Sequence, residues 1–457
     1  MSTKYRVVNP ASGQVESEFP TATDTEVERA VSAAHSAFQR WRAAPLAERA
    51  AVLRGVADLY ERRKDTLAPI VTREMGKTLA EAVGEVEYCA LVYRYFADNA
   101  EQLLADEPLS TGDAVIRKSP TGVILGIMPW NYPHYQVARF VGPNLVAGNT
   151  VLLKHAPQCP ESALAMEELF AEAGLLHGAY VNIFATNDQV AGLIADERVR
   201  GVSVTGSERA GAAVATLAGQ YLKKVVLELG GSDPYLVLDA EELDPIVRAC
   251  AEARFGNAGQ ACNAAKRLIV AEPIYDEFVA DLVERVTSDY RTGDPLDPAV
   301  TLGPMSSEGA LQTLDAQVQD AVSKGATVHT GGHRLPGRGA YYPPTVLSGV
   351  TPDMRAYREE LFGPVAVVYR ASSVDDAVEL ANDSPFGLGA AVFHRDETSA
   401  AEIADRIDAG MVFINSAELG RPELPFGGTK RSGVGRELGP HGIDEFLNLK
   451  MVRKPGA

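Results

Sequence analysis

The stretches GVILGIMPWN, residues 122–131, and NTVLLK, residues 149–154, decide which fold class this sequence indicates. Each is a short apolar run that ends in a turn, and helical spacing resumes after it. The same pattern returns in YVNIFA, GVSVTG and KKVVLELGG, residues 180–185, 201–206 and 223–231. Apolar strands that alternate with helices predict a parallel, doubly wound α/β sheet, in which ligands bind at the carboxyl ends of the strands.

Around this region the sequence predicts helices before it and a second α/β unit after it. Residues 23–44 carry apolar side chains at helical spacing, with Asp24 as the expected N-cap. The second unit begins at PYLVLD, residues 234–239, and includes a strand expected at 410–416. The tail NLKMVRKPGA, residues 448–457, is typical of an edge strand that pairs with other elements or with another subunit.

The bulk properties exclude several classes of protein. A chain of 457 residues is too long for one compact core, so two or three domains are expected. With 43 basic and 61 acidic residues the net charge is −18, which disfavours nucleic acid and membrane surfaces as partners. The four cysteines have neither CxxC spacing nor a histidine at metal-ligand spacing, so no metal site is expected. Because neither a signal peptide nor a membrane-spanning apolar run is visible, a cytoplasmic location is expected.

Three motifs carry residues suited to acyl chemistry. Cys262 lies in FGNAGQACNAAKR, where small residues let the backbone bend and an expected loop-to-helix junction would favour the thiolate. Glu228 closes the apolar strand VVLEL, where burial would raise its pKa toward that of a general base. Asn131, in the stiff loop PWNYP, offers an amide that suits an oxyanion. Taken singly, each has a simpler interpretation: a buried structural cysteine, an exposed glutamate and a loop asparagine.

Five motifs in this order and spacing, PWNYP, LELGGSDP, GQAC, EELFGPV and PFGGTKRSGVGRE, resemble the aldehyde dehydrogenase superfamily. The resemblance covers nearly the whole chain and is greatest to the bacterial, NADP-type succinate-semialdehyde dehydrogenase branch. It implies that Cys262 attacks the aldehyde carbon, that the Asn131 side chain and the Cys262 N–H hold the oxyanion, and that Glu228 activates water. The reaction implied is NAD(P)-dependent oxidation of an aldehyde to a carboxylic acid, with succinate semialdehyde as the expected substrate.

The resemblance also implies a dinucleotide site. Lys154 aligns with the family's lysine on the adenosine ribose, and GSERAG, residues 206–211, opens a helix whose N-terminus suits a pyrophosphate. NAD-preferring relatives often carry a glutamate where this chain has Pro157, and that glutamate repels a 2′-phosphate. Lys154 and His155 would add positive charge, although His155 is equally compatible with a surface residue that contacts nothing. NADP is therefore the expected cofactor and NAD the alternative. The other expected cofactor contacts are Trp130, Gly206, Ser207, Leu229, Glu360 and Phe362.

For the substrate, Arg139 aligns with an arginine that binds the distal carboxylate in succinate-semialdehyde relatives, since a guanidinium suits bidentate binding. The alternative is an arginine held in a structural ion pair. A second arginine of some relatives is replaced here by Gly256, and the loop at 416–425 carries Glu418 and Arg421. Arg421 is a candidate replacement for the missing charge, whereas Glu418 would repel a carboxylate. An uncharged or aromatic aldehyde is therefore the alternative substrate.

The resemblance implies two doubly wound parallel-sheet domains and a small oligomerisation hairpin and tail, so a homodimer or homotetramer is expected. A CoA-acylating enzyme is a rival, against which the candidate base Glu228 argues. A non-catalytic structural or binding protein on the same scaffold is another, against which the intact set of Cys262, Glu228 and Asn131 argues. The expected division is 1–104 with 121–229 for cofactor binding, 230–435 for catalysis, and 105–120 with 436–457 for oligomerisation.

Overall fold

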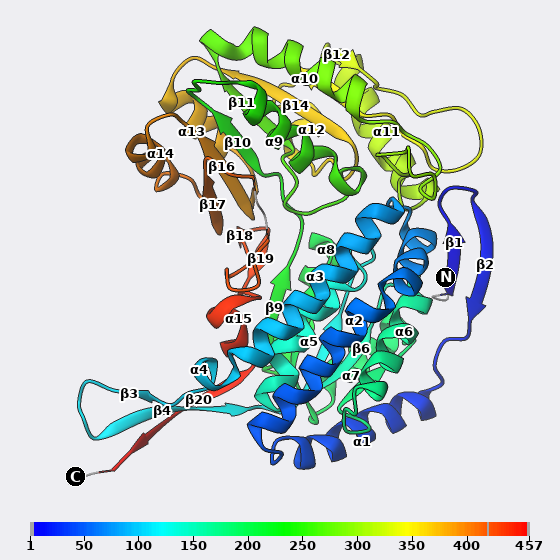
Figure 1. The fold of residues 1–457 in the computed structure, drawn as a ribbon, viewed down its shortest axis with the longest axis vertical. Helices are drawn as coiled ribbons and strands as arrows, with labels where there is room; N and C mark the ends of the chain where they lie inside the picture. Colours follow the sequence, from blue (N-terminus) through cyan, green and yellow to red (C-terminus); the bar gives the residue numbers. More distant parts are fainter. Residues whose placement is uncertain (1–3, 418–419, 455–457) are drawn as a thin grey trace.

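The computed structural model describes residues 4–417 and 420–454. Two large sheets, each covered by helices, lie one above the other in Figure 1, and a narrow arm extends from the lower part. Among the described residues, no helix is both long enough and apolar enough to cross a membrane. The α/β class with two doubly wound sheets, expected from the sequence, is confirmed.

The first sheet contains the strands that the sequence motifs predict. Its strand order is β19-β9-β8-β5-β6-β7, and all neighbours are parallel except β19 and β9. Parallel strands end at the same edge, so Lys154, Thr205 and Glu228, which close three of them, lie along that edge. The strands are β5 Val123–Ile127, β6 Thr150–Lys154, β7 Tyr180–Asn182, β8 Val199–Thr205, β9 Lys224–Glu228 and β19 Gly433–Val434.

The short strand β19 departs from the expected domain division. Gly433 pairs with Glu228, and Val434 pairs with Leu227. The sequence assigned residues 433–434 to the catalytic segment, yet they complete the sheet of the cofactor segment. Such a pairing joins residues about 200 positions apart, and no local pattern in the sequence signals it.

Helices cover both faces of the first sheet. Along β5, Ile124 enters one apolar core and Leu125 the other, because successive side chains of a strand point to opposite faces. Helix α1 lies within the stretch expected to be helical, but it begins at Asp24, and its N-cap is Thr23 rather than Asp24. The Thr23 hydroxyl accepts a hydrogen bond from Glu26 N in a capping box. The helices are α1 Asp24–Trp41, α2 Leu46–Met75, α3 Leu79–Asp98, α4 Ala100–Leu103, α5 Tyr135–Ala147, α6 Pro160–Glu172, α7 Asn187–Ala195 and α8 Glu208–Gln220. The hairpin of β1 Tyr5–Asn9 and β2 Gln14–Phe19 precedes them.

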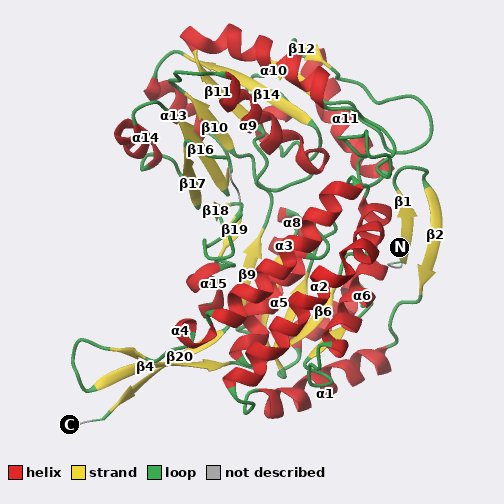
Figure 2. Ribbon diagram, in the orientation of Figure 1, coloured by secondary structure: helices red, strands yellow, loops and turns green. Residues whose placement is uncertain are grey.

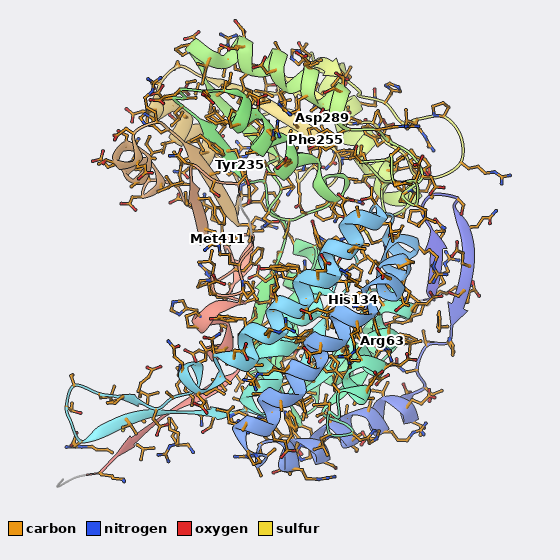
Figure 3. All side chains as sticks on the ribbon, in the orientation of Figure 1. Arg63, His134, Tyr235, Phe255, Asp289 and Met411 are labelled. Atoms are coloured by element: carbon orange, nitrogen blue, oxygen red, sulfur yellow. The ribbon has the colours of Figure 1, made fainter. Side chains whose placement is uncertain are left out.

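The second sheet is buried on both faces in the same way. Its order is β12-β13-β14-β11-β10-β16-β17, parallel except for β12 and β13. Tyr235, labelled in Figure 3, and Val237 of β10 enter one core, while Leu236 enters the other. Met411 of β17 packs against the core of the first sheet, so the two units share an apolar interface. The strands are β10 Pro234–Val237, β11 Arg267–Ala271, β12 Thr327–Thr330, β13 Thr345–Ser348, β14 Val365–Ala371, β16 Gly389–Phe393 and β17 Met411–Ile414.

The helices of the second unit alternate with these strands. They are α9 Asp244–Phe255, α10 Tyr275–Asp289, α11 Glu308–Ser323, α12 Arg355–Arg358, α13 Val374–Asn382 and α14 Glu397–Ala404, with the 3₁₀ turns η1 Gly256–Gly259 and η2 Glu272–Ile274. The short strands β15 Phe386–Gly387 and β18 Thr429–Lys430 pair with each other on the path back to the first sheet.

The arm is a three-stranded antiparallel sheet that projects from the body (Figure 2). It is built from β3 Glu107–Pro108, β4 Ala114–Pro120 and β20 Leu447–Arg453, and the helix α15 Gly439–Asp444 leads into it. The register runs from Leu447 opposite Pro120 to Arg453 opposite Ala114. The hairpin and the C-terminal tail that the sequence grouped together therefore form one sheet.

Candidate active site

Cys262 lies where two cavities meet. The strand-end cavity, of about 260 Å³, opens beside the carboxyl ends of β8 and β9, and the helix-side cavity, of about 330 Å³, opens between α3, α5 and α9. Cys262 and Gln136 line both. The other three cysteines are fully buried in the apolar cores, whereas Cys262 is partly exposed. The geometry therefore singles out the one thiol that a ligand reaches from two sides.

The sequence predicts a helix directly after Cys262, but the described residues there form none, so this prediction is wrong. Cys262 and Asn263 form a turn, the next residue forms a bend, and β11 begins at Arg267. A helix N-terminus therefore does not favour the thiolate here. Burial raises the pKa of the Cys262 thiol. Two positively charged side chains, Arg139 and Lys266, lower that pKa and offset part of the effect of burial. The net result is a pKa raised to about 12.

The backbone before the nucleophile adopts a rare conformation. Asn257, Ala258 and Gly259 have φ values of 56°, 51° and 69°. These values lie in the left-handed region, which residues other than glycine rarely adopt. The loop is held by its neighbours: Asn257 N donates to Glu81 Oε1 at 2.6 Å, and Asn257 Nδ2 donates to Asn131 O at 3.0 Å. A strained loop persists only when the surrounding structure determines it, and such loops concentrate at functional sites.

Asn131 and Glu228 line the strand-end cavity together with Cys262. Asn131 is buried, and its amide Nδ2 donates to Gln260 O at 2.9 Å, two residues before the nucleophile. Glu228 is 1% exposed, and neither carboxyl oxygen has a hydrogen-bond partner in the structure. Burial raises its pKa well above the ordinary value, against the opposing charge of Arg139. The expectation that burial shifts Glu228 toward a general base's range is in line with this environment.

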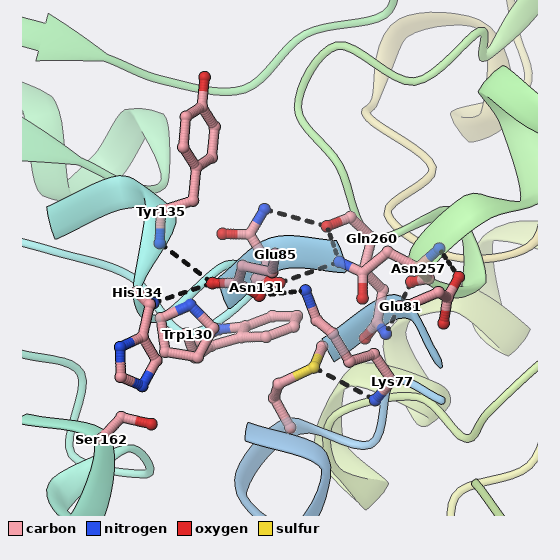
Figure 4. Close-up of polar contacts among 12 residues, drawn as sticks. Lys77, Glu81, Glu85, Trp130, Asn131, His134, Tyr135, Ser162, Asn257 and Gln260 are labelled. Atoms are coloured by element: carbon pink, nitrogen blue, oxygen red, sulfur yellow. Dashed lines mark hydrogen bonds and ion pairs between the residues drawn. The ribbon is translucent and has the colours of Figure 1, made fainter. Parts of the chain in front are cut away.

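A buried ion pair supports the loop that carries Asn131 (Figure 4). Lys77 Nζ donates to Glu85 Oε2 at 2.6 Å, both side chains are fully buried, and Nζ lies 3.7 Å from the ring centroid of Tyr132. Glu85 Oε1 accepts from the N–H groups of His134 and Tyr135, at 2.8 and 3.1 Å. These N–H groups at the start of α5 have no partner within the helix, so the Glu85 carboxylate caps the helix from outside. The sequence carries no local signal for this pair, because Lys77 lies in the loop before α3 and Glu85 lies eight residues later within that helix.

Six of the expected cofactor contacts gather around the strand-end cavity. Ser207 is the N-cap of α8, and its hydroxyl accepts from Ala210 N at 3.3 Å, so the helix N-terminus opens at this cavity as expected. A side chain at Gly206 would meet nothing within 4 Å, so the space in front of this turn is open. The six are Trp130, Gly206, Ser207, Leu229, Glu360 and Phe362.

Three other residues that the sequence predicts to contact the cofactor, Lys154, His155 and Pro157, do not line the strand-end cavity. Lys154 ends β6, and burial lowers its pKa to about 8. His155 is fully buried: its Nε2 lies 2.9 Å from Pro133 O, and its Nδ1 accepts from Ala156 N at 2.7 Å. Burial also lowers the pKa of His155 to about 4, so the ring is neutral at pH 7 and supplies no positive charge. Pro157 adds no charge, and its carbonyl accepts from Arg6 N at 2.9 Å.

Arg139 lies in α5 and lines the helix-side cavity with Cys262. Its Nε pairs with the buried carboxylate of Glu437, which agrees with the structural ion pair named as the alternative. Its Nη1 and Nη2 nitrogens, however, are buried without a hydrogen-bond partner in the structure, as is the hydroxyl of Tyr88 on the same cavity. The guanidinium thus pairs with Glu437 at Nε and lies against Phe426, 4.2 Å from the ring centroid, while Nη1 and Nη2 are buried donors without an acceptor among the described residues.

The other residues expected near the substrate are placed differently. Gly256 lines the helix-side cavity, and a side chain there would meet nothing within 4 Å, so the missing second arginine leaves open space. Arg421 is exposed and does not belong to the lining of this cavity, so the structure does not bring it to Cys262. Glu418 lies outside the described residues.

Comparisons with known proteins agree with this geometry. The model of the aldehyde dehydrogenase family matches residues 1–452. A succinate-semialdehyde dehydrogenase (NADP+) of Deinococcus radiodurans is 53% identical over 98% of this chain and 94% of its own length, and one from Mycobacterium tuberculosis is 46% identical over 97% and 98%. The crystal structure of succinic semialdehyde dehydrogenase from Streptococcus pyogenes in complex with NADP+ matches with a TM-score of 0.97 at 42% identity, covering 99% of this chain and 100% of that one. This chain belongs to the aldehyde dehydrogenase family.

Proposed function

We propose that this enzyme oxidises succinate semialdehyde to succinate with NADP as the oxidant. The observation that carries the proposal is the position of Cys262 between two cavities with different linings. The strand-end cavity holds the candidate oxyanion and base residues, and the helix-side cavity holds the unpartnered edge of Arg139. The names of relatives at 46–53% identity support the same substrate and cofactor.

In the proposed mechanism Cys262 attacks the aldehyde carbon as a thiolate. The amide of Asn131 and the backbone N–H of Cys262 hold the oxygen that becomes negative, at a buried position where such hydrogen bonds are strong. The residues that line the strand-end cavity would hold NADP, which would supply the hydride acceptor, and loss of the hydride leaves a thioester on Cys262. Glu228 then takes a proton from water, which attacks the thioester and releases the carboxylate and the free thiol. Because burial raises the pKa of Glu228, this step speeds up as the pH rises through that pKa.

The strand-end cavity has the features that a dinucleotide requires. The N-terminus of α8 at Ser207 offers backbone N–H groups to a phosphate, and the open space at Gly206 lets the ligand approach the backbone closely. Glu360, which lines the cavity with about one fifth of its side chain exposed, offers a carboxylate to ribose hydroxyls. We propose that Lys154 alone, without His155, supplies the charge for a 2′-phosphate, and that Pro157 removes the repulsion of a glutamate.

The test is a steady-state comparison of succinate semialdehyde with butanal, an aldehyde of the same carbon number without the carboxylate, each with NADP and with NAD. Formation of the reduced nicotinamide is followed by its absorbance. We expect kcat/KM to be about tenfold or more higher for succinate semialdehyde and for NADP, since a charge-assisted hydrogen bond contributes about 1.5–3 kcal/mol. The variant Cys262→Ser should lose turnover with both aldehydes.

The outcomes separate the parts of the proposal. Faster turnover of butanal would overturn the substrate assignment and leave the reaction class intact. Equal use of the two cofactors would overturn the NADP assignment. Full turnover by Cys262→Ser would overturn the mechanism.

The proposal extends to assembly and location. We propose that the arm of β3, β4 and β20 is the oligomerisation element, because Leu449 and Met451 of β20 are 50% and 57% exposed. A dimer or tetramer would cover these side chains. The four free cysteines support a reducing compartment such as the cytoplasm.

A further inference from the structure

Lys266, four residues after Cys262, is a buried lysine with three polar partners. Its side chain is 1% exposed. Its Nζ donates to Ala261 O at 2.8 Å and to Cys262 O at 2.7 Å, and lies 3.1 Å from Glu360 Oε1. An ammonium group has three N–H donors, so the three partners satisfy it fully. The motif GQACNAAKR contains this lysine, but neither the nucleophile nor the base assignment uses it.

The contact with Ala261 O determines where the Cys262 N–H points. A trans peptide is planar, and its C=O and N–H groups point in opposite directions. A donor that holds Ala261 O therefore holds the N–H of Cys262 on the opposite side of the same plane. Because the donor is charged, it also polarises the peptide and strengthens that N–H as a donor.

The neighbours of Lys266 fix the ammonium itself. Glu360 Oε1, its ion-pair partner, also accepts from Gly231 N at 3.1 Å. Gly231 packs so closely on Cys262 that a side chain there would lie 2.4 Å from Cys262 O. The ammonium is therefore held between the nucleophile's own carbonyl and a carboxylate that is anchored on the backbone after Glu228. These two partners of the ammonium are themselves held, one by close packing and the other by a hydrogen bond, which suits a group that sets an orientation.

We propose that Lys266 is a positioning residue that aims the backbone N–H of Cys262 at the substrate oxygen when that oxygen becomes negative. The inference rests on the proposed role of Cys262 as nucleophile and adds a residue to the oxyanion site that no motif assigned. A lysine that merely neutralised Glu360 would support the fold or the cofactor, but it would not act on one kind of thiol reaction more than on another.

Two reactions of Cys262, both run without cofactor, separate these roles. In acylation by p-nitrophenyl acetate, the sulfur–carbon bond forms through a tetrahedral oxyanion, and the ester C–O bond breaks to release p-nitrophenolate. In alkylation by iodoacetamide, the sulfur–carbon bond forms in one displacement that releases iodide, with no oxyanion. Both reactions require the thiolate, so its fraction cancels in the ratio of the two rate constants at one pH.

We expect Lys266→Met to lower the ratio of acylation to alkylation about tenfold, less than the loss of a whole oxyanion donor, which costs about 10²–10³. The matched control is Lys223→Met, because Lys223 Nζ also donates to two backbone carbonyls, Asp196 O at 2.9 Å and Val199 O at 2.6 Å, at a distant site. Its ratio should stay at the wild-type value. Equal losses in both reactions of Lys266→Met, or no loss in either, would overturn the proposal.

A second comparison covers the case in which Lys266→Met fails to fold because Glu360 is left unpaired. The double variant Lys266→Met/Glu360→Gln leaves neither charge unpaired, and its reference is the single variant Glu360→Gln. The ratio should again fall about tenfold between these two, and an unchanged ratio would overturn the proposal. Cys262→Ala should abolish both reactions; if it did not, the proposed nucleophile would be wrong, whatever the role of Lys266.

Discussion

At the scale of single residues, burial controls the reactivity of the proposed nucleophile. It raises the pKa of Cys262 to about 12, and the charges of Arg139 and Lys266 offset only part of the effect. Below the pKa of a thiol, each unit of pH raises the thiolate fraction tenfold. We therefore expect alkylation of the cofactor-free enzyme by iodoacetamide to accelerate about tenfold per unit between about pH 6 and pH 9. Cys262→Ala measures the background of the three buried cysteines, and a plateau below about pH 8 would contradict the prediction.

A second prediction concerns the proposed carboxylate site at Arg139. Removing the arginine alone would leave Glu437 buried and unpaired, which would destabilise the fold and obscure any effect on the substrate. The informative comparison is Arg139→Gln/Glu437→Gln, which leaves neither charge unpaired, against the unaltered enzyme. We expect kcat/KM for succinate semialdehyde to fall about 10- to 100-fold in the double variant, the value of one charge-assisted contact, while butanal changes little. An equal fall for both aldehydes would assign Arg139 to the fold alone.

At the scale of secondary-structure elements, α5 depends on α3 for its N-terminal cap. The N-cap residue His134 makes no side-chain capping bond, and Glu85 of α3 accepts from the first N–H groups instead. Neutralising Glu85 would leave Lys77 as an unpaired buried ammonium. We expect Glu85→Gln to lower the free energy of unfolding by about 3 kcal/mol, measured by urea denaturation followed by far-UV circular dichroism.

The matched variant is Lys77→Met/Glu85→Gln, which leaves neither charge unpaired. It should regain most of the lost stability, because the cost of the single variant comes from a buried charge without its partner. If the double variant were less stable than Glu85→Gln, the ion pair would itself be strongly stabilising, and our physical account of it would be wrong.

At the scale of the whole molecule, the arm presents apolar side chains to solvent. Leu449 and Met451 lie on β20, the edge strand of the arm. If the arm mediates assembly, Leu449→Glu/Met451→Lys should reduce the mass measured by light scattering to that of a smaller assembly or a single chain. Val15→Glu is the control, since Val15 is 49% exposed on β2, away from the arm (Figure 1). An unchanged mass in the double variant would remove the arm from the interface.

The sequence predicted most elements of this fold because their signals are local. The strands β5, β6, β8 and β9 end where apolar runs meet turn residues. Thr23 rather than Asp24 caps α1 because Glu26, three residues on, completes a reciprocal capping box, which is a local signal that the Asp24 prediction overlooks. The place of β19 in the first sheet has no local signal, because it depends on a pairing with β9, about 200 positions away in the chain.

By itself the sequence determined the fold class and the family and predicted three candidate groups of the site, because these depend on residue types at short spacings. Only the tertiary structure decided the charge and the orientation of the residues in and around the site. The neutral ring of His155, the raised pKa of Glu228 and the position of Lys266 against the Cys262 carbonyl depend on what surrounds each residue. Desolvation and hydrogen bonding are properties of a three-dimensional environment, and residues far apart in the chain create that environment.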